Sequence, residues 1–257
     1  MSENLHFVQY GAGPGSPLVL LHGFGGSGEV WAGMAVRLGE GRRVICFDLP
    51  GHGGSVDCPK AGPAKTAVRT VLADLETAGI ARFHLAGHSF AGAVATLIAL
   101  SAPQAVASLT LLAPGGFGPQ INARLLRRFA AARDAEALRQ ILEAMYGFAN
   151  PLPDAALDML VRQRSDERVA ASIASIGGQL FAEDRQGEIP RDGFADLPMP
   201  VKVLWGDQDA VLPASQLAGL PSRFALHRFA DTGHMLIEEK AEDVAMLIEE
   251  NMRAGGG

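Results

Sequence analysis

The chain has 257 residues, of which 48% are hydrophobic and 19% are charged, a size and composition that suit one large α/β domain or two small ones. Acidic residues outnumber basic ones by 28 to 22, which disfavours sequence-independent nucleic-acid binding because that needs a basic surface. No apolar run approaches the roughly 20 residues of a membrane span, and two cysteines make no disulfide framework. The N-terminus has no charged segment followed by an apolar stretch, so we predict no signal peptide and a cytoplasmic location.

Short apolar runs alternate with helical stretches along the chain. The apolar runs are nearly continuous, which is typical of parallel strands that helices cover on both faces. We therefore predict an α/β fold with a mostly parallel sheet. In chain order the predicted elements are a strand at 17–23, a helix at 29–40, a strand at 42–48, a helix at 64–80, a strand at 82–87, a helix at 90–100, strands at 108–114, 200–206 and 224–230, and a helix at 237–252.

The interval 115–191 interrupts this alternation, because it contains no convincing strand. Two charged, helix-like stretches cover 122–147 and 154–178. An insertion between two parallel strands would lie over the carboxyl ends of the strands, where ligands bind in open α/β folds. We predict that it is a helical lid inserted before the last two strands. The alternative is a helical subdomain without a gating role.

The segment "HLAGHSFAG" (84–92) places a serine between a predicted strand and a predicted helix. A G-x-S-x-G nucleophile elbow occupies this position, and its strained serine needs small residues two places before and after it. Gly87 and Ala91 meet that need, although alanine replaces the usual glycine. We therefore predict that Ser89 is a catalytic nucleophile. The alternative is that Ser89 only caps the helix.

A serine nucleophile needs a histidine base, and the base needs a carboxylate that orients it. For an elbow in a parallel sheet, the partners should follow in the order serine, acid, histidine, each after a late strand. Asp207 and Asp209 follow the strand at 200–206, and His234 follows the strand at 224–230. Asp231, three residues before His234, is a further candidate acid.

The oxyanion hole should use the amide that follows the nucleophile and one from a loop after an early strand. We predict the amides of Phe90 and of Phe24, which lies in the glycine-rich segment "HGFGGSG" (22–28). His22, His52, His88 and Asp48 are interpreted as residues that hold these loops in shape. Aromatic and methionine residues near the elbow and the lid suggest an apolar acyl pocket: Phe24, Phe90, Phe117, Phe129, Met145, Tyr146, Phe148 and Met235.

Taken together, these segments resemble the α/β-hydrolase superfamily over nearly the whole chain. The matching segments are "HGFGG", "DLPGHGGS", "GHSFAG", "WGDQDAVLP" and "GHM", in the family's order and spacing. The resemblance implies the α/β-hydrolase fold and selects Asp209, in W-G-x-x-D, as the acid. The segment "LAPGGFGPQIN" (112–122) is similar to the hydrolase-like domain of acetoin dehydrogenase acyltransferase subunits. We find no lipoyl domain of the kind those subunits carry. We therefore expect that the chain does not work by itself as a lipoyl-bearing acyltransferase.

We predict a core formed by 1–114 and 192–257 and a lid formed by 115–191. The predicted function is a serine hydrolase that cleaves a small-to-medium carboxylic ester or thioester through an acyl-enzyme on Ser89. Two alternatives stay open: a carbon–carbon bond hydrolase or acyltransferase with the same triad, and a non-enzymatic small-molecule receptor. We expect a small-molecule acyl substrate, no metal and no cofactor, since ligand spacings and phosphate-binding loops are missing. The sequence leaves the oligomeric state open.

Overall fold

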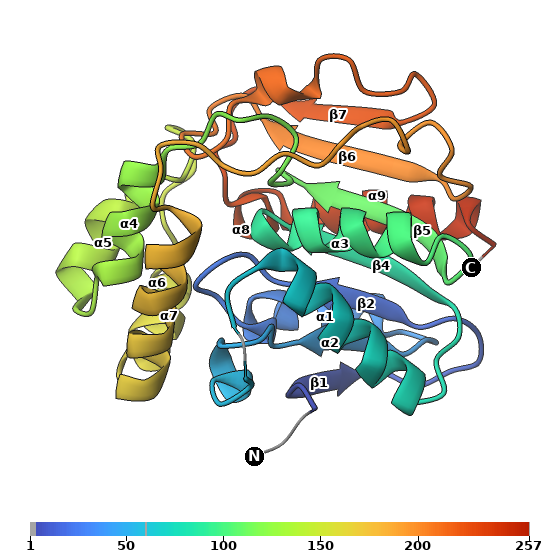
Figure 1. Ribbon diagram of the computed structural model, residues 1–257, viewed down its shortest axis with the longest axis horizontal. Helices are drawn as coiled ribbons and strands as arrows, with labels where there is room; N and C mark the ends of the chain where they lie inside the picture. The colour runs from blue at the N-terminus through green and yellow to red at the C-terminus, as the bar shows by residue number, and fades with distance from the viewer. Residues whose placement is uncertain (1–3, 60, 257) are drawn as a thin grey trace.

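The computed structural model describes residues 4–59 and 61–256 (Figure 1). Residues 1–3, 60 and 257, which belong to the predicted core, lie outside the described residues. The described residues form a seven-stranded sheet in the order β1-β3-β2-β4-β5-β6-β7. The strands are β1 (Phe7–Tyr10), β2 (Leu18–Leu21), β3 (Val44–Phe47), β4 (Phe83–His88), β5 (Val106–Leu112), β6 (Val201–Gly206) and β7 (Ala225–Phe229).

The sheet is parallel except at one edge. Strand β1 pairs with β3 in the antiparallel sense, whereas all other neighbouring strands are parallel. Every residue of β2, β3, β4 and β5 is buried, as expected for strands covered on both faces. The predicted fold class is therefore confirmed, and the carboxyl ends of the parallel strands lie at one edge of the sheet.

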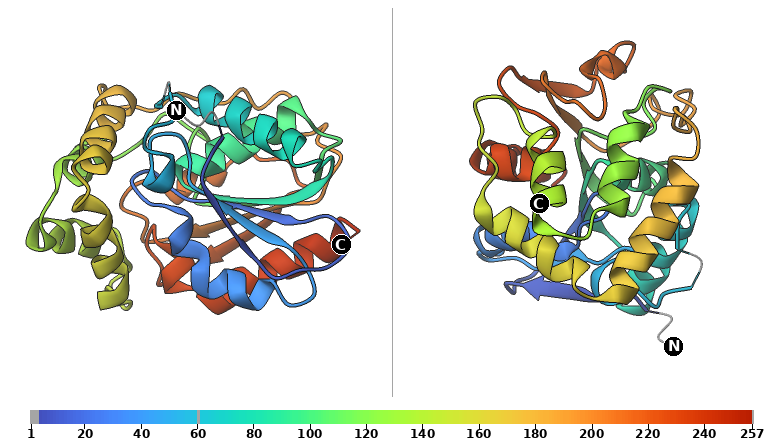
Figure 2. Two further views of the ribbon diagram at one scale, coloured as in Figure 1. Left: turned by 90° about the horizontal axis from the view of Figure 1, so that it is seen from below. Right: turned by 90° about the vertical axis from the view of Figure 1, so that its left-hand side faces the viewer.

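Helices cover both faces of the sheet (Figures 1 and 2). Helices α2 and α3 pack together on one face, and α1 and α9 pack together on the other. Four more helices, α4–α7, lie at the end of the sheet where the parallel strands finish (Figure 1); we call them the four-helix layer. The helices are α1 (Ala32–Leu38), α2 (Ala64–Thr77), α3 (Phe90–Ser101), α4 (Ala123–Ala131), α5 (Ala135–Glu143), α6 (Asp154–Arg164), α7 (Glu167–Leu180), α8 (Leu236–Glu239) and α9 (Ala241–Ala254).

The four-helix layer connects β5 to β6, within the interval predicted to be an insertion. Each of the two helix-like stretches contains two helices, because an aspartate starts a new helix inside it. The side chain of Asp134 accepts a hydrogen bond from the amide of Ala137, and that of Asp166 accepts one from the amide of Arg168. Both are N-caps that satisfy otherwise unpaired amides of a first helical turn.

Three details differ from the sequence prediction. Strand β1 was not predicted, and its Phe7 and Val8 are 47% and 40% exposed, so it has no buried apolar run. The predicted helix 29–40 is a 3₁₀ turn, Gly28–Trp31, followed by α1. The predicted helix 237–252 is divided into α8 and α9 at Lys240, whose φ of −136° and ψ of 40° are not helical.

Candidate active site

The turn between β4 and α3 holds Ser89 in a strained conformation. Its φ is 55° and its ψ is −119°, a region that residues with a side chain rarely adopt. A Cβ atom on Gly87 would lie 2.4 Å from the carbonyl oxygen of Ala91, which explains the glycine there. The turn is braced because the amide of Ser89 donates to the carbonyl of Leu112, at 2.9 Å. Ser89 therefore projects from a rigid turn at the N-terminus of α3.

His234 lies just before α8, in the loop that follows β7. Its backbone amide donates to the carbonyl oxygen of Met145 at 2.7 Å, and its side chain is 4% exposed. Nε2 of the ring lies 2.8 Å from Oγ of Ser89. The structure thus brings together two residues that are 145 positions apart in the chain.

Asp209 lies in the loop after β6 and completes this chain of hydrogen bonds. Its Oδ2 lies 2.8 Å from Nδ1 of His234, and its Oδ1 accepts hydrogen bonds from the amides of Val211 and Leu212, both at 2.8 Å. Nε1 of the buried Trp205 donates to the carbonyl of Leu212 at 3.0 Å and so holds the same loop. The Asp209 side chain is fully buried. Its position is fixed because one carboxylate oxygen is bonded to His234 and the other to the loop amides.

The other two candidate acids are not hydrogen-bonded to His234 among the described residues. Oδ1 of Asp207 accepts a hydrogen bond from Nε of Arg228 at 2.7 Å. The backbone oxygen of Asp231 accepts one from Asn150. Across residues 4–59 and 61–256, neither carboxylate makes a hydrogen bond to His234. The geometry therefore favours Asp209 over both.

The glycine-rich loop after β2 lies directly against the serine. A Cβ atom on Gly23 would be 3.3 Å from Cβ of Ser89. His22 holds this loop: its Nε2 accepts from the amide of Leu49 at 2.9 Å, and its Nδ1 donates to the carbonyl of Gly23 at 2.7 Å. The amides of Phe24 and Phe90 donate no backbone or side-chain hydrogen bond within the part of the chain that the structure describes, so both are free to bind a ligand.

Two further buried groups support the site without contacting Ser89 Oγ. Nε2 of His88 donates to the carbonyl of His234 at 2.8 Å, and burial lowers the pKa of His88 to about 3, so that its ring is neutral. Asp48 accepts hydrogen bonds from the amides of Gly28 and Gly54, at 2.6 and 2.8 Å. These contacts agree with the predicted structural roles of both residues.

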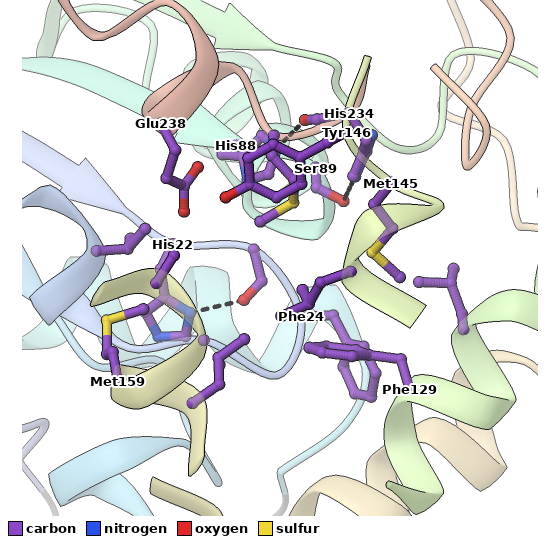
Figure 3. Close-up of a pocket in the computed structure, with 18 residues that line it drawn as sticks. His22, Phe24, His88, Ser89, Phe129, Met145, Tyr146, Met159, His234 and Glu238 are labelled. Carbon is purple, nitrogen blue, oxygen red and sulfur yellow. Dashed lines mark hydrogen bonds between the residues drawn. The ribbon is translucent and has the colours of Figure 1, made fainter. Parts of the chain in front are cut away.

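Two pockets meet at Ser89, and Phe24 and Leu126 line both of them. The first is a small cavity of about 60 Å³ between the sheet end and the four-helix layer (Figure 3). We call it the small cavity; His234, Tyr146 and Glu238 line it. The second, of about 590 Å³, we call the large pocket. Its lining is mainly apolar and includes Phe90, Leu97, Ile121, Leu180, Phe181, Ile189 and Leu212.

The predicted apolar residues divide into three groups. Phe129, Met145 and Met235 line the small cavity with Phe24 and Tyr146, and Phe90 lines the large pocket. Phe117, in contrast, is a core residue that contacts Phe194, and Phe148 is 97% exposed; for these two the prediction was wrong.

Glu238 was missed by the sequence analysis. It lies in the short helix α8 (Leu236–Glu239), four residues after His234, which precedes that helix. Because most glutamates in helices are solvated, nothing in its composition singled it out. The sequence carried no signal for it, since only the folded structure places its side chain in the small cavity.

The described residues offer neither a cluster of metal ligands nor a membrane-spanning helix. They contain no group of three or more His, Cys, Asp or Glu side chains placed to hold a metal ion. None of the described helices is long and apolar enough to cross a bilayer.

Comparisons with known proteins give the family context. The model of the Alpha/beta hydrolase family matches residues 18–247. The chain is 33% identical, over 241 residues, to the dihydrolipoyllysine-residue acetyltransferase component of the acetoin cleaving system of Cupriavidus necator. That match covers 93% of this chain but only 64% of the relative. It confirms the predicted similarity to acetoin acyltransferase subunits.

A second relative matches along almost its full length. The chain is 32% identical to the pimeloyl-[acyl-carrier protein] methyl ester esterase of Methylococcus capsulatus, with 93% of this chain and 95% of the relative covered. Among solved structures, a meta-cleavage product hydrolase from Pseudomonas fluorescens superposes with a TM-score of 0.84. The superposition covers 97% of this chain and 94% of that protein, and the two sequences are 21% identical. The two proteins therefore share a fold.

Proposed function

Because the chain belongs to the alpha/beta hydrolase family, we propose that it is a serine hydrolase that cleaves a small-to-medium carboxylic ester or thioester. The observation that carries this proposal is the continuous chain of hydrogen bonds from Ser89 Oγ through His234 to Asp209. A hydroxyl, an imidazole and a buried carboxylate in this order make a nucleophile out of a serine that is unreactive alone.

In the proposed first step, Oγ of Ser89 attacks the acyl carbon while Nε2 of His234 takes its proton. Asp209 keeps the proton of His234 on Nδ1, so that Nε2 is free to accept, and it stabilises the imidazolium that forms. The strained turn adds orientation, because the hydroxyl stays aimed at one position.

The negative charge that develops on the acyl oxygen needs donors that are already in place. The amides of Phe24 and Phe90, which have no partner among the described residues, are the proposed donors, and the N-terminus of α3 favours the same charge. Removal of one such donor costs on the order of 10²–10³ in rate.

The tetrahedral intermediate then collapses, and His234 gives its proton to the leaving oxygen or sulfur. In the second half, His234 removes a proton from water, the hydroxide attacks the acyl-enzyme, and Ser89 regains its proton as the acid leaves. Each proton passes through the same nitrogen, Nε2, which is the ring atom that faces Ser89.

We also propose that residues 115–191 act as a lid over a core of 1–114 and 192–257. Two contacts support this division. Arg162 and Gln163 of α6 donate to Glu29 and to Ser27, both at 2.7 Å, so the four-helix layer contacts the end of the glycine-rich segment 22–28 and the residue that follows it. Closure would exclude water from the site. The cytoplasmic location remains a prediction.

The alternatives are separated by substrate. A carbon–carbon bond hydrolase would turn over ring-fission products without turning over esters, and an acyltransferase would need an acceptor other than water. A receptor would show ligand-induced thermal shifts without turnover. The buried acid and aligned histidine favour an enzyme, since a receptor needs neither.

The test of the proposal is hydrolysis of p-nitrophenyl butyrate by the wild type and by Ser89→Ala. We expect kcat/KM to fall at least about 10³-fold in the variant. Ser101→Ala, an exposed serine at the end of α3, is the matched control and should match wild type. Equal hydrolysis by Ser89→Ala and wild type would overturn the proposal.

A further inference from the structure

Two polar side chains in the small cavity carry an oxygen that has no hydrogen-bond partner in the part of the chain that the structure describes. Oη of Tyr146 and Oε2 of Glu238 are buried, and neither has a hydrogen-bond partner among residues 4–59 and 61–256. Both side chains line the cavity that contains Ser89 and His234, and Figure 3 shows them at the end away from Phe129. A buried polar atom without a partner lowers the stability of the folded protein. A polar ligand group that bonds to these oxygens would remove that cost.

The neighbouring Glu239 shows that Glu238 is not needed to hold the loop. Oε2 of Glu239 accepts hydrogen bonds from the amides of Gly147 and Gly233, at 2.8 and 2.9 Å, and Oε1 accepts one from the amide of Met235 at 3.0 Å. Glu239 therefore ties the loop between α5 and α6 to the loop that carries His234. The Oε2 atom of Glu238 accepts no hydrogen bond from these loop amides, and its side chain lines the cavity instead.

The position of His234 decides which part of the substrate enters the small cavity. The proposed mechanism requires His234 to give a proton to the leaving oxygen, so the leaving group must lie beside its ring. His234 lines the small cavity and is not among the residues that line the large pocket, as far as the described residues show. The large pocket, which has by far the greater volume, then holds the acyl chain.

From these observations we infer that the small cavity binds the alcohol part of an ester, and that Tyr146 and Glu238 select a small alcohol with a second hydroxyl group. The substrate class is a monoester of a short diol or polyol. This inference rests on the proposed function and adds to it the chemical class of the leaving group.

The size and the charge state of the cavity fit this class. A volume of about 60 Å³ has room for about four or five water-sized groups. Burial, with Glu239 nearby, raises the pKa of Glu238 to about 8, and burial also raises the pKa of Tyr146. At neutral pH both groups are uncharged and can each donate and accept, as a hydroxyl partner requires.

The reaction balances without a further reactant. The bond from Ser89 Oγ to the acyl carbon forms, the bond from that carbon to the alcohol oxygen breaks, and the proton of Ser89 reaches the alcohol oxygen through His234. The diol leaves with both hydroxyls intact, and water releases the acid.

The test compares two esters of equal shape, 2-hydroxyethyl butyrate and n-propyl butyrate, which differ by a hydroxyl in place of a methyl. The measurement is the ratio of their kcat/KM values in wild type, Tyr146→Phe, Glu238→Met and Tyr10→Phe. Each of the first two variants should lower the ratio about two- to tenfold, the effect of one neutral hydrogen bond. Tyr10 lies on β1, so Tyr10→Phe is the matched control and should keep the wild-type ratio.

Ratios that stay unchanged in Tyr146→Phe and Glu238→Met would overturn the inference and leave the serine hydrolase proposal standing. If wild type hydrolyses neither ester, calorimetry still tests the inference. It measures the affinity of each ester for Ser89→Ala and for the double variant Ser89→Ala with Tyr146→Phe. The inference is supported if Ser89→Ala binds 2-hydroxyethyl butyrate more tightly than n-propyl butyrate and Tyr146→Phe removes this preference. It is overturned if both proteins bind the two esters with equal affinity. Thermal unfolding of each variant checks that it is folded.

Discussion

Asp209 and His234 are joined by a hydrogen bond of 2.8 Å between Oδ2 and Nδ1, while the other oxygen of Asp209 accepts two loop amides. The carboxylate is therefore fixed before a substrate arrives. Because an imidazole that donates from Nδ1 presents an unprotonated Nε2, the acid determines which ring nitrogen faces Ser89.

The first prediction concerns this acid. In Asp209→Asn the shape is kept, but an amide can hold His234 in the wrong tautomer, so kcat should fall on the order of 10³–10⁴. Asp207→Asn is the matched control, because Asp207 pairs with the exposed Arg228 instead, and it should lose less than twofold. Steady-state kinetics with p-nitrophenyl butyrate measure both. A larger loss in Asp207→Asn than in Asp209→Asn would reassign the acid.

The second prediction concerns the turn that carries Ser89. Gly87→Ala should destabilise the protein by about 1–3 kcal/mol, because its Cβ would collide with the carbonyl of Ala91 and force the backbone to shift. The shift moves Ser89, so activity should fall as well. Gly33→Ala in α1 is the control, since a Cβ there meets nothing within 4 Å. Urea unfolding should show Gly33→Ala to be as stable as wild type or more so, and a tolerated Gly87→Ala would contradict the steric argument.

The third prediction concerns stability in acid. Burial lowers the pKa of His84 to about 4, with Arg42 and Arg82 lowering it further. In the unfolded chain this histidine binds a proton near pH 6.5, so the unfolded state gains more protons as the pH falls from 6.5 towards 4. Stability should therefore decrease over this range, by about 1 kcal/mol per pH unit for one histidine.

The variant His84→Asn tests that slope. Urea unfolding at pH 7.5, 6 and 5 should show a shallower loss in His84→Asn than in wild type, whatever the absolute stability of the variant. Parallel curves for the two proteins would mean that His84 does not contribute to acid denaturation. His84 bonds to Ser108 within the sheet, so the result is independent of catalysis.

The fourth prediction concerns Glu238 at higher pH. Its pKa is raised by burial to about 8, against about 4.5 for an ordinary glutamate. Between these values the folded state holds a proton that the unfolded state has lost, so this residue lowers stability as the pH rises from 4.5 to 8. Glu238→Gln should remove that part of the slope, and Glu76→Gln, at an exposed position of α2, should not. Equal slopes in all three proteins would contradict a protonated Glu238.

Much of the fold follows from the sequence because its central strands are continuous apolar runs. β2, β3, β4 and β5 are buried along their whole length, and a run of this kind has few other environments. Strand β1 could not be found in this way, since most of its residues are exposed. The first residues of α5 and α7 are set by single aspartate N-caps that lie inside longer helical patterns. Hydrophobic periodicity does not detect such caps.

The site divides in the same way. The sequence predicted that Ser89, Asp209 and His234 come together because each follows a strand, and the ends of parallel strands meet at one edge. The structure joins the three side chains by hydrogen bonds. Sequence could not separate the small cavity from the large pocket, because that division depends on how the four-helix layer packs. Glu238 illustrates the limit: its role depends on burial of one oxygen, and a sequence carries no direct record of burial.

The central claim is that Ser89 is an activated nucleophile, and covalent labelling tests it most directly. Wild type, Ser89→Ala and Ser101→Ala are each treated with an alkyl fluorophosphonate and analysed by intact mass and peptide mapping. We predict one adduct, on Ser89, in wild type and in Ser101→Ala, and none in Ser89→Ala. An adduct that forms equally in Ser89→Ala, or a folded wild type that stays unlabelled, would contradict the claim.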